Sequence, residues 1–156
     1  MTVALIPMSR SAFEERVGTL LSRYSGDLQR ERGMTESDAA AEALRQMKVV
    51  LPEGFDSDKM ILRSACVDSN VVGWVWASLP GAPGRPEMAW LHNIEVDPDY
   101  RSNGYGRAIL LAIEEELSQL RVTRLGLNVF GQNKRAIRLY ESLGYRVMSQ
   151  QMAKRI

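Results

Sequence analysis

A short segment near the middle of the 156-residue chain has the composition of an anion-binding loop. It reads Arg101-Ser102-Asn103-Gly104-Tyr105-Gly106, and Arg107 follows it directly. Glycines allow unusual backbone dihedral angles and let the main chain approach a ligand closely. Arginines add charge-assisted hydrogen bonds to phosphate oxygens. Together these residue types predict a binding site for a diphosphate group.

The elements on either side of this loop support the prediction. A β-type run over residues 90–96 precedes it and ends at the Asp97-Pro98 turn. After the loop, apolar residues recur at helical spacing, while the glutamates at 114–116 fall on the opposite face. The first turn of a helix has N–H groups without partners and the positive end of the helix dipole. A phosphate placed there is therefore held by backbone donors.

Two common phosphate-binding motifs do not fit this segment. A Walker loop ends in Gly-Lys-Ser/Thr, whereas Gly106 is followed by Arg107. A dinucleotide-binding fingerprint needs a third glycine at the position of Ile109. The segment instead resembles the acyl-CoA-binding motif of the GNAT superfamily of N-acetyltransferases, Arg/Gln-x-x-Gly-x-Gly/Ala, which Arg101, Gly104 and Gly106 match.

A second segment extends this resemblance. A strand over residues 125–130 leads to Asn133 and then to residues 136–145, which look like the family's Asn…Leu-Tyr-x-x-x-Gly-Phe/Tyr signature. The resemblance covers residues 60–156. It implies a mixed α/β fold whose central, mostly antiparallel sheet has about six or seven strands, is splayed at its central strand and is flanked by about four helices.

The resemblance also implies acetyl-CoA as cosubstrate and no metal. The acetyl group would pass directly to a primary amine in a ternary complex, without an acyl-enzyme. The family's cofactor-binding positions correspond to the splayed-strand backbone at Ile94, Glu95 and Val96, to the loop residues Arg101, Ser102, Asn103, Gly104, Tyr105, Gly106 and Arg107, and to Asn133 and Tyr140. An amide at the splay could also stabilise the thioester oxygen as negative charge develops there.

The attacking amine must lose a proton, because an alkyl ammonium with a pKa of about 10 is almost wholly charged at neutral pH. His92 is the only histidine and lies on the central strand, and histidine has a suitable pKa for a base. A catalytic histidine of the arylalkylamine N-acetyltransferases matches His92; polyamine acetyltransferases have a glutamate there. Glu95 is the rival, although strand alternation places it on the opposite face unless a bulge re-aims it. A water relay without a dedicated base is the third alternative.

The departing thiolate needs a proton donor. Tyr140 lies in the second motif, where many GNAT enzymes place a general acid. The coenzyme thiol resembles cysteine in acidity, with a pKa of about 8.5, so a phenol with a pKa of about 10 can protonate or hydrogen-bond its thiolate. The alternative role of Tyr140 is packing in an apolar stripe with Ala136 and Leu143. The branch that acetylates protein N-termini often has a glutamate where this chain has Asn128, which disfavours a ribosomal-protein acceptor.

Composition defines the setting of this chemistry. We expect one domain, 1–156, in which an N-terminal strand and acceptor-side helices (1–57) precede the sheet and acetyl-CoA-binding core (58–156). The net charge of +1 gives no broad field for nucleic acid. We expect no membrane association and a cytoplasmic location, since no apolar run approaches about 20 residues. The single cysteine, Cys66, excludes an internal disulfide.

Local patterns predict the remaining elements. Ser11 to Glu14 form a capping box before the first helix, and Thr35 caps a second. Residues 60–67 and 71–79 form a hairpin with Trp74 and Trp76 on one face. Residues 80–86 form an exposed loop that could overhang the acceptor site. The β-rich run 145–152 could pair with a second copy to give a homodimer.

These observations are compatible with three hypotheses about the activity. An N-acetyltransferase acting on a primary amine is the leading one. A non-catalytic CoA-binding or sensing domain, and an acyltransferase that uses a longer acyl-CoA, are the alternatives. A pure CoA-binding domain would need neither a strand histidine nor a motif tyrosine, so His92, Glu95 and Tyr140 together favour an enzyme.

Overall fold

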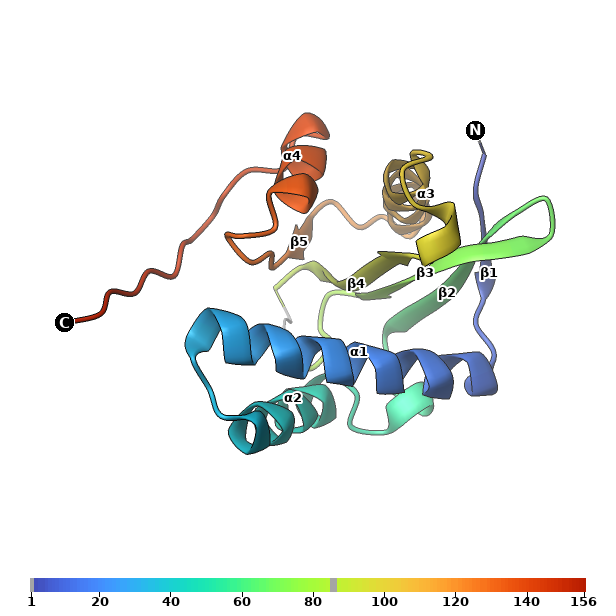
Figure 1. The fold of residues 1–156 in the computed structure, drawn as a ribbon. Coiled ribbons are helices and arrows are strands. Elements are labelled where there is room, and N and C mark those ends of the chain that lie inside the picture. The colour runs from blue at the N-terminus through green and yellow to red at the C-terminus, as the bar shows by residue number, and fades with distance from the viewer. Residues whose placement is uncertain (1, 85–86) are drawn as a thin grey trace.

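The protein has a mixed α/β fold, seen in a computed structural model that describes residues 2–84 and 87–156 (Figure 1). Arg85 and Pro86 of the expected loop 80–86 lie outside the described residues. The strands are β1 (Ala4–Pro7), β2 (Met60–Val67), β3 (Asn70–Ser78), β4 (Ala89–Val96) and β5 (Leu125–Leu127). The helices are α1 (Arg10–Arg32), α2 (Glu36–Val50), α3 (Tyr105–Gln119) and α4 (Lys134–Ser142).

One sheet contains these strands in the order β1-β2-β3-β4-β5. The pairs β1–β2, β2–β3 and β3–β4 are antiparallel, and β5 is parallel to β4. The β2–β3 hairpin turns at Asp68 and Ser69, both with positive φ, as their turn-forming composition predicts. The mostly antiparallel sheet of the expected fold is confirmed.

Helices cover both faces of the sheet (Figure 1). On one face, the apolar stripe of α3 packs on the sheet, and α4 joins the same cluster through Tyr140 and Leu143. On the other face, α1 and α2 pack against Trp74 and Trp76, which share that face as predicted. Of the helices that the structure describes, not one combines the length and apolar composition needed to span a membrane.

The sheet has fewer strands than expected. The described residues form five strands, because the C-terminal run 145–152 is unpaired. The last strand, β5, is also shorter than expected and ends at Leu127 rather than at residue 130. β propensity by itself does not make a strand, which needs a partner edge to satisfy its backbone groups. Beyond Tyr145 the chain leaves the body of the molecule as an extended tail (Figure 1).

The first helix begins earlier than its capping box suggests. Ser9, not Ser11, is the N-cap of α1, and its Oγ accepts a hydrogen bond from the Ala12 amide at 3.2 Å. Both serines suit the role, and the chain enters the helix directly after β1, which selects the first of them. Thr35 caps α2 as predicted and accepts from the Asp38 amide at 3.1 Å.

Candidate active site

A β-bulge in β4 orients the polar side chains of the site. Trp76 of β3 lies opposite Asn93, and the next residue, Ala77, lies opposite Leu91, so His92 is the extra residue. A bulge of this kind turns consecutive side chains to one face. His92 stacks on Trp76 with ring centroids 4.4 Å apart. Glu95 therefore shares the face of His92, in contrast to the expectation from simple alternation.

Ser78 and Trp76 fix the imidazole of His92. The Nε2 atom lies 2.9 Å from the Oγ of Ser78, whose side chain is completely buried. The interplanar angle with Trp76 is 22°, which is a stacked arrangement. One ring nitrogen and one ring face are thus held by the sheet, and the orientation of the imidazole follows from both.

A cavity of about 250 Å³ is lined in part by His92. The C-terminal half of α2 contributes Arg45, Gln46, Val49 and Val50 to its wall. The remaining described lining consists of Trp90 and His92 on β4, Asn128 after β5, and Gly84 from the loop before β4. Gly84 is the one described residue of the loop 80–86 in this lining, and the position of that loop over an acceptor site stays a prediction.

Glu95 is engaged by neighbouring donors. Its Oε2 accepts from Trp74 Nε1 at 3.1 Å and lies 3.1 Å from Nη1 of Arg23 on α1. The same guanidinium donates from Nη2 to the Oδ1 of Asn93 at 3.1 Å. Asn93 is buried, and its Nδ2 has no acceptor among the described residues. Glu95 thus forms part of a network between β4 and α1.

The edge of β4 toward β5 is open along its second half. β5 pairs only with residues 89–91. The Asp97 amide donates to the Val72 carbonyl on the β3 side at 2.9 Å. Since alternate amides of a strand point to opposite sides, those of Ile94 and Val96 are directed away from β3. Two backbone donors therefore face the open edge.

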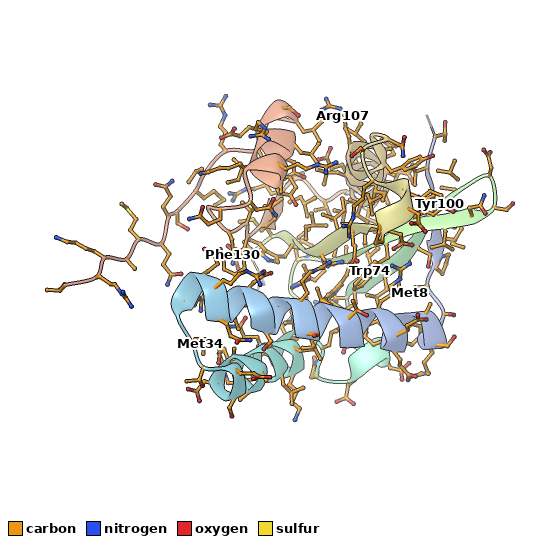
Figure 2. All side chains as sticks on the ribbon, in the orientation of Figure 1. Met8, Met34, Trp74, Tyr100, Arg107 and Phe130 are labelled. Carbon is orange, nitrogen blue, oxygen red and sulfur yellow. The ribbon has the colours of Figure 1, made fainter. Side chains whose placement is uncertain are left out.

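The predicted anion loop connects this edge to α3. Gly104 is the N-cap residue of α3, with φ of 80° and no side-chain cap, so the first-turn amides keep their unpaired character. Arg101 Nε donates to the Val96 carbonyl at 3.1 Å, and Asn103 Nδ2 donates to the Arg101 carbonyl at 3.0 Å. Arg107 Nη1 donates to Ser142 Oγ at 2.9 Å and links α3 to α4. Figure 2 marks Arg107 on α3, across the sheet from the side on which Trp74 faces α1.

This order of splayed strand, glycine loop and uncapped helix is accompanied by a family match. The sequence model of the acetyltransferase (GNAT) family matches residues 22–145. The chain belongs to the GNAT acetyltransferase family. It is therefore an acyltransferase by family, and acetyl-CoA is the cosubstrate that the family uses.

Several proteins are similar to this GNAT chain. The uncharacterised N-acetyltransferase YycN of Bacillus subtilis is 25% identical over 158 residues, covering 100% of both chains. The YycN crystal structure superposes with a TM-score of 0.91 at 24% identity, covering 99% of each chain. The [ribosomal protein bS18]-alanine N-acetyltransferase of Escherichia coli is 51% identical over 59 residues, which are 38% of this chain and 40% of that protein. AAC(6')-Iy, solved with a CoA-S-monomethyl-acetylneamine bisubstrate analogue, gives a TM-score of 0.57 at 16% identity, covering 100% of this chain and 99% of that one.

Two further residues from the GNAT motifs lie on or before α4. Asn133 caps this helix, because its Oδ1 accepts from the Ala136 amide at 3.2 Å. Tyr140 packs against the core, with its ring 5.6 Å from that of Tyr145. Burial raises the pKa of the Tyr140 phenol above the ordinary value. Tyr140 therefore packs in the core, as its alternative role requires, and its phenol is also neutral at physiological pH, as a proton donor requires.

Sequence reasoning missed the residues that support these groups. Ser78, Asn93 and Arg45 gave no signal, because an ordinary strand serine, strand asparagine and helix arginine have no distinguishing spacing. Arg16 and Arg23 lie seven positions apart on α1, which places them on one helical face. Arg16 pairs with Asp97 as Arg23 pairs with Glu95, so that spacing could have indicated a contact with acidic strand residues.

Proposed function

We propose that the chain is an N-acetyltransferase that transfers the acetyl group of acetyl-CoA to a primary amine by direct attack, with both substrates bound together. The observation that carries the proposal is the position of His92. The bulge places this imidazole in the lining of a cavity on a strand whose following residues, 94–96, have an open edge. An amine in the cavity and an acyl group along that edge would approach each other beside His92.

We assign the base to His92 rather than to Glu95. The imidazole lines the cavity, and Ser78 and Trp76 hold it there. The Glu95 carboxylate is instead held by Trp74 and Arg23 in the network with α1. A positioned histidine within reach of the ammonium would accept its proton. Glu95 then acts as a positioning residue for Arg23 and α1.

Acetyl-CoA would supply an acetyl group activated as a thioester. The residues present fit this group, because the α3 N-terminus has no side-chain cap and the edge of β4 is open. The first-turn amides after Gly104, with Arg101 and Arg107, would bind the diphosphate. The Ile94 and Val96 amides on the open edge would bind the pantetheine arm, whereas the Glu95 backbone faces β3. Ser102 and Asn103 lie in the loop before α3, Tyr105 and Gly106 form its first turn, and Asn133 caps α4. An amide on the open edge would stabilise negative charge on the carbonyl oxygen.

Tyr140 would donate the proton that the departing thiolate needs. Its raised pKa keeps the phenol protonated, and hydrogen bonding to a thiolate needs only that form.

Because acetyl-CoA carries several charges and does not cross a membrane unaided, we also propose that the protein is located in the cytoplasm, where acetyl-CoA is supplied. The C-terminal tail, with exposed apolar side chains, supports a homodimer as a further part of the proposal.

The first experiment incubates the purified chain with acetyl-CoA and a panel of amines, following thiol release against a control without amine. We expect release that depends on one class of amine. His92→Gln should lower kcat/KM by about 10²-fold or more and leave CoA affinity intact, whereas Glu95→Gln should retain most activity. The reverse ranking would move the base to Glu95. CoA binding without release by any amine would support a sensing domain, and release only from longer acyl-CoAs would support the other alternative.

A further inference from the structure

The charges around the cavity indicate what kind of amine it takes. We infer that the acceptor is a small molecule with one amine and a carboxylate, rather than a polyamine or another molecule with several positive charges. This inference rests on the proposed function, because it concerns the second substrate of the same site.

Arg45 is the one charged side chain in the described lining of the cavity. Its Nε and Nη2 donate to the two carboxylate oxygens of Glu42, at 2.8 and 2.7 Å. Arg45 is mostly exposed and extends from α2, and a guanidinium has donors beyond the two that Glu42 engages. A carboxylate on the acceptor can therefore pair with Arg45, whereas a second ammonium would be repelled.

Three acidic residues on this side of the sheet are already paired with arginines. Glu95 pairs with Arg23, Asp97 with Arg16, and Glu42 with Arg45. Hydrogen bonds from Arg45 and then Gln46 lower the pKa of Glu42, which keeps that carboxylate charged and paired. The described lining thus offers a cation and amide groups, but no carboxylate, to an incoming molecule.

The size and the apolar wall of the cavity agree with this inference. A volume of about 250 Å³ is below the roughly 300–1,000 Å³ typical of pockets for drug-sized ligands, so the acceptor is of amino-acid size. Val49, Val50 and Trp90 provide apolar wall for its carbon skeleton.

The test compares three amines with one skeleton. Phenylalanine carries a carboxylate, phenylalaninamide a neutral amide, and 3-phenylpropane-1,2-diamine a second amine in its place. Thiol release is measured at fixed acetyl-CoA, and kcat/KM is calculated per neutral amine so that differences in amine pKa do not enter. We expect kcat/KM to be highest for phenylalanine, lower for phenylalaninamide and lowest for the diamine. A tripeptide with N-terminal phenylalanine tests whether a peptide N-terminus is preferred instead.

Variants of the Arg45–Glu42 pair should shift the preference in opposite directions. Arg45→Gln should lower the carboxylate-to-diamine ratio of kcat/KM by about threefold to tenfold, as expected for a partly exposed charge. Glu42→Gln releases Arg45 and should raise the same ratio. The matched control is Arg30→Gln, because Arg30 forms a pair of the same spacing with Asp27 on α1 and is absent from the described lining.

The outcomes separate this inference from the proposed function. Preference for the diamine, or a ratio that Arg45→Gln and Arg30→Gln change equally, would overturn the inference while leaving an active acetyltransferase. Preference for the tripeptide would replace the small molecule with a peptide acceptor. If neither these four compounds nor the wider amine panel gives thiol release, both the inference and the proposed function are overturned.

Discussion

Two neighbouring tyrosines differ in what their hydroxyl groups contact. The Tyr145 hydroxyl donates to the Glu114 carboxylate at 2.7 Å, whereas the Tyr140 hydroxyl has no hydrogen bond among the described residues. We expect Tyr140→Phe to lower kcat by about 10²-fold with unchanged CoA affinity, because only the proton donor is lost. Tyr145→Phe is the matched control. It should cost about 1 kcal/mol of stability, measured by urea unfolding, and leave kcat near the wild-type value. Equal kcat in both variants would remove Tyr140 from the chemistry.

The raised pKa of Tyr140 has a consequence for the pH profile. Burial disfavours the phenolate, so the folded protein keeps this proton at pH values where a free tyrosine, with a pKa of 10.0, is already losing it. We expect no loss of kcat from Tyr140 ionisation between pH 7 and about 10. The measurement is kcat against pH for wild type and Tyr140→Phe. An alkaline decline below pH 10 that only the wild type shows would contradict this assignment.

At the level of elements, the start of α3 is the predicted cofactor site. A glutamate at Gly104 adds negative charge beside the first-turn amides and must adopt a φ of 80°. We expect Gly104→Glu to weaken CoA binding at least 10²-fold, as measured by calorimetry. Gly33→Glu is the control, because Gly33 ends α1 with φ of 64° and open space around it. Equal CoA affinity in wild type and Gly104→Glu would refute the cofactor assignment for this helix.

The β3–β4 pairing depends on a second glycine. A Cβ at Gly73 would lie 2.1 Å from the Glu95 carbonyl oxygen, so the two strands could not keep this spacing. We expect Gly73→Ala to lower the free energy of unfolding by at least 1–3 kcal/mol, on the order of other overpacked sites, as measured by urea denaturation. Gly18→Ala, in α1 with open space, should have the opposite sign by about 0.5–1 kcal/mol. Similar effects of the two substitutions would contradict the close approach of the strands.

For the whole molecule, the tail beyond Tyr145 is the least integrated part of the chain. Val147, Met148 and Met152 are 67%, 69% and 88% exposed. Met148 Sδ lies 4.0 Å from Arg124 Nη2, which brings the tail near the outer edge of β5. Since an open sheet edge and an apolar strand-forming segment can pair between copies, we expect a homodimer in solution.

Light scattering after size-exclusion chromatography measures the mass of the 156-residue chain and of a chain that ends at Met148. The shorter chain should be monomeric, or should form a weaker dimer that dissociates at a higher protein concentration, because it lacks the outer apolar residues. As a control, Lys154→Ser and Arg155→Ser should leave the dimer intact. A monomeric 156-residue chain at micromolar concentration would contradict the proposed homodimer.

The sequence by itself determined the elements whose signals are local. The apolar stripe of α3, the β2–β3 hairpin and the Thr35 cap all follow from spacing and turn composition within a few residues. The Gly104 loop was found in the same way, because glycine and arginine types fix its chemistry without reference to distant residues. The resemblance to the GNAT family, now shown, came from two such local motifs.

Only the tertiary structure decided how distant segments meet. The bulge at His92 depends on the register between β3 and β4, and no pattern within residues 90–96 specifies that extra residue. The pairing of Glu95 with Arg23 joins positions far apart in the chain and depends on how α1 crosses the sheet. The C-terminal run stayed unpaired for the same reason, since a strand forms only where backbone partners are within reach.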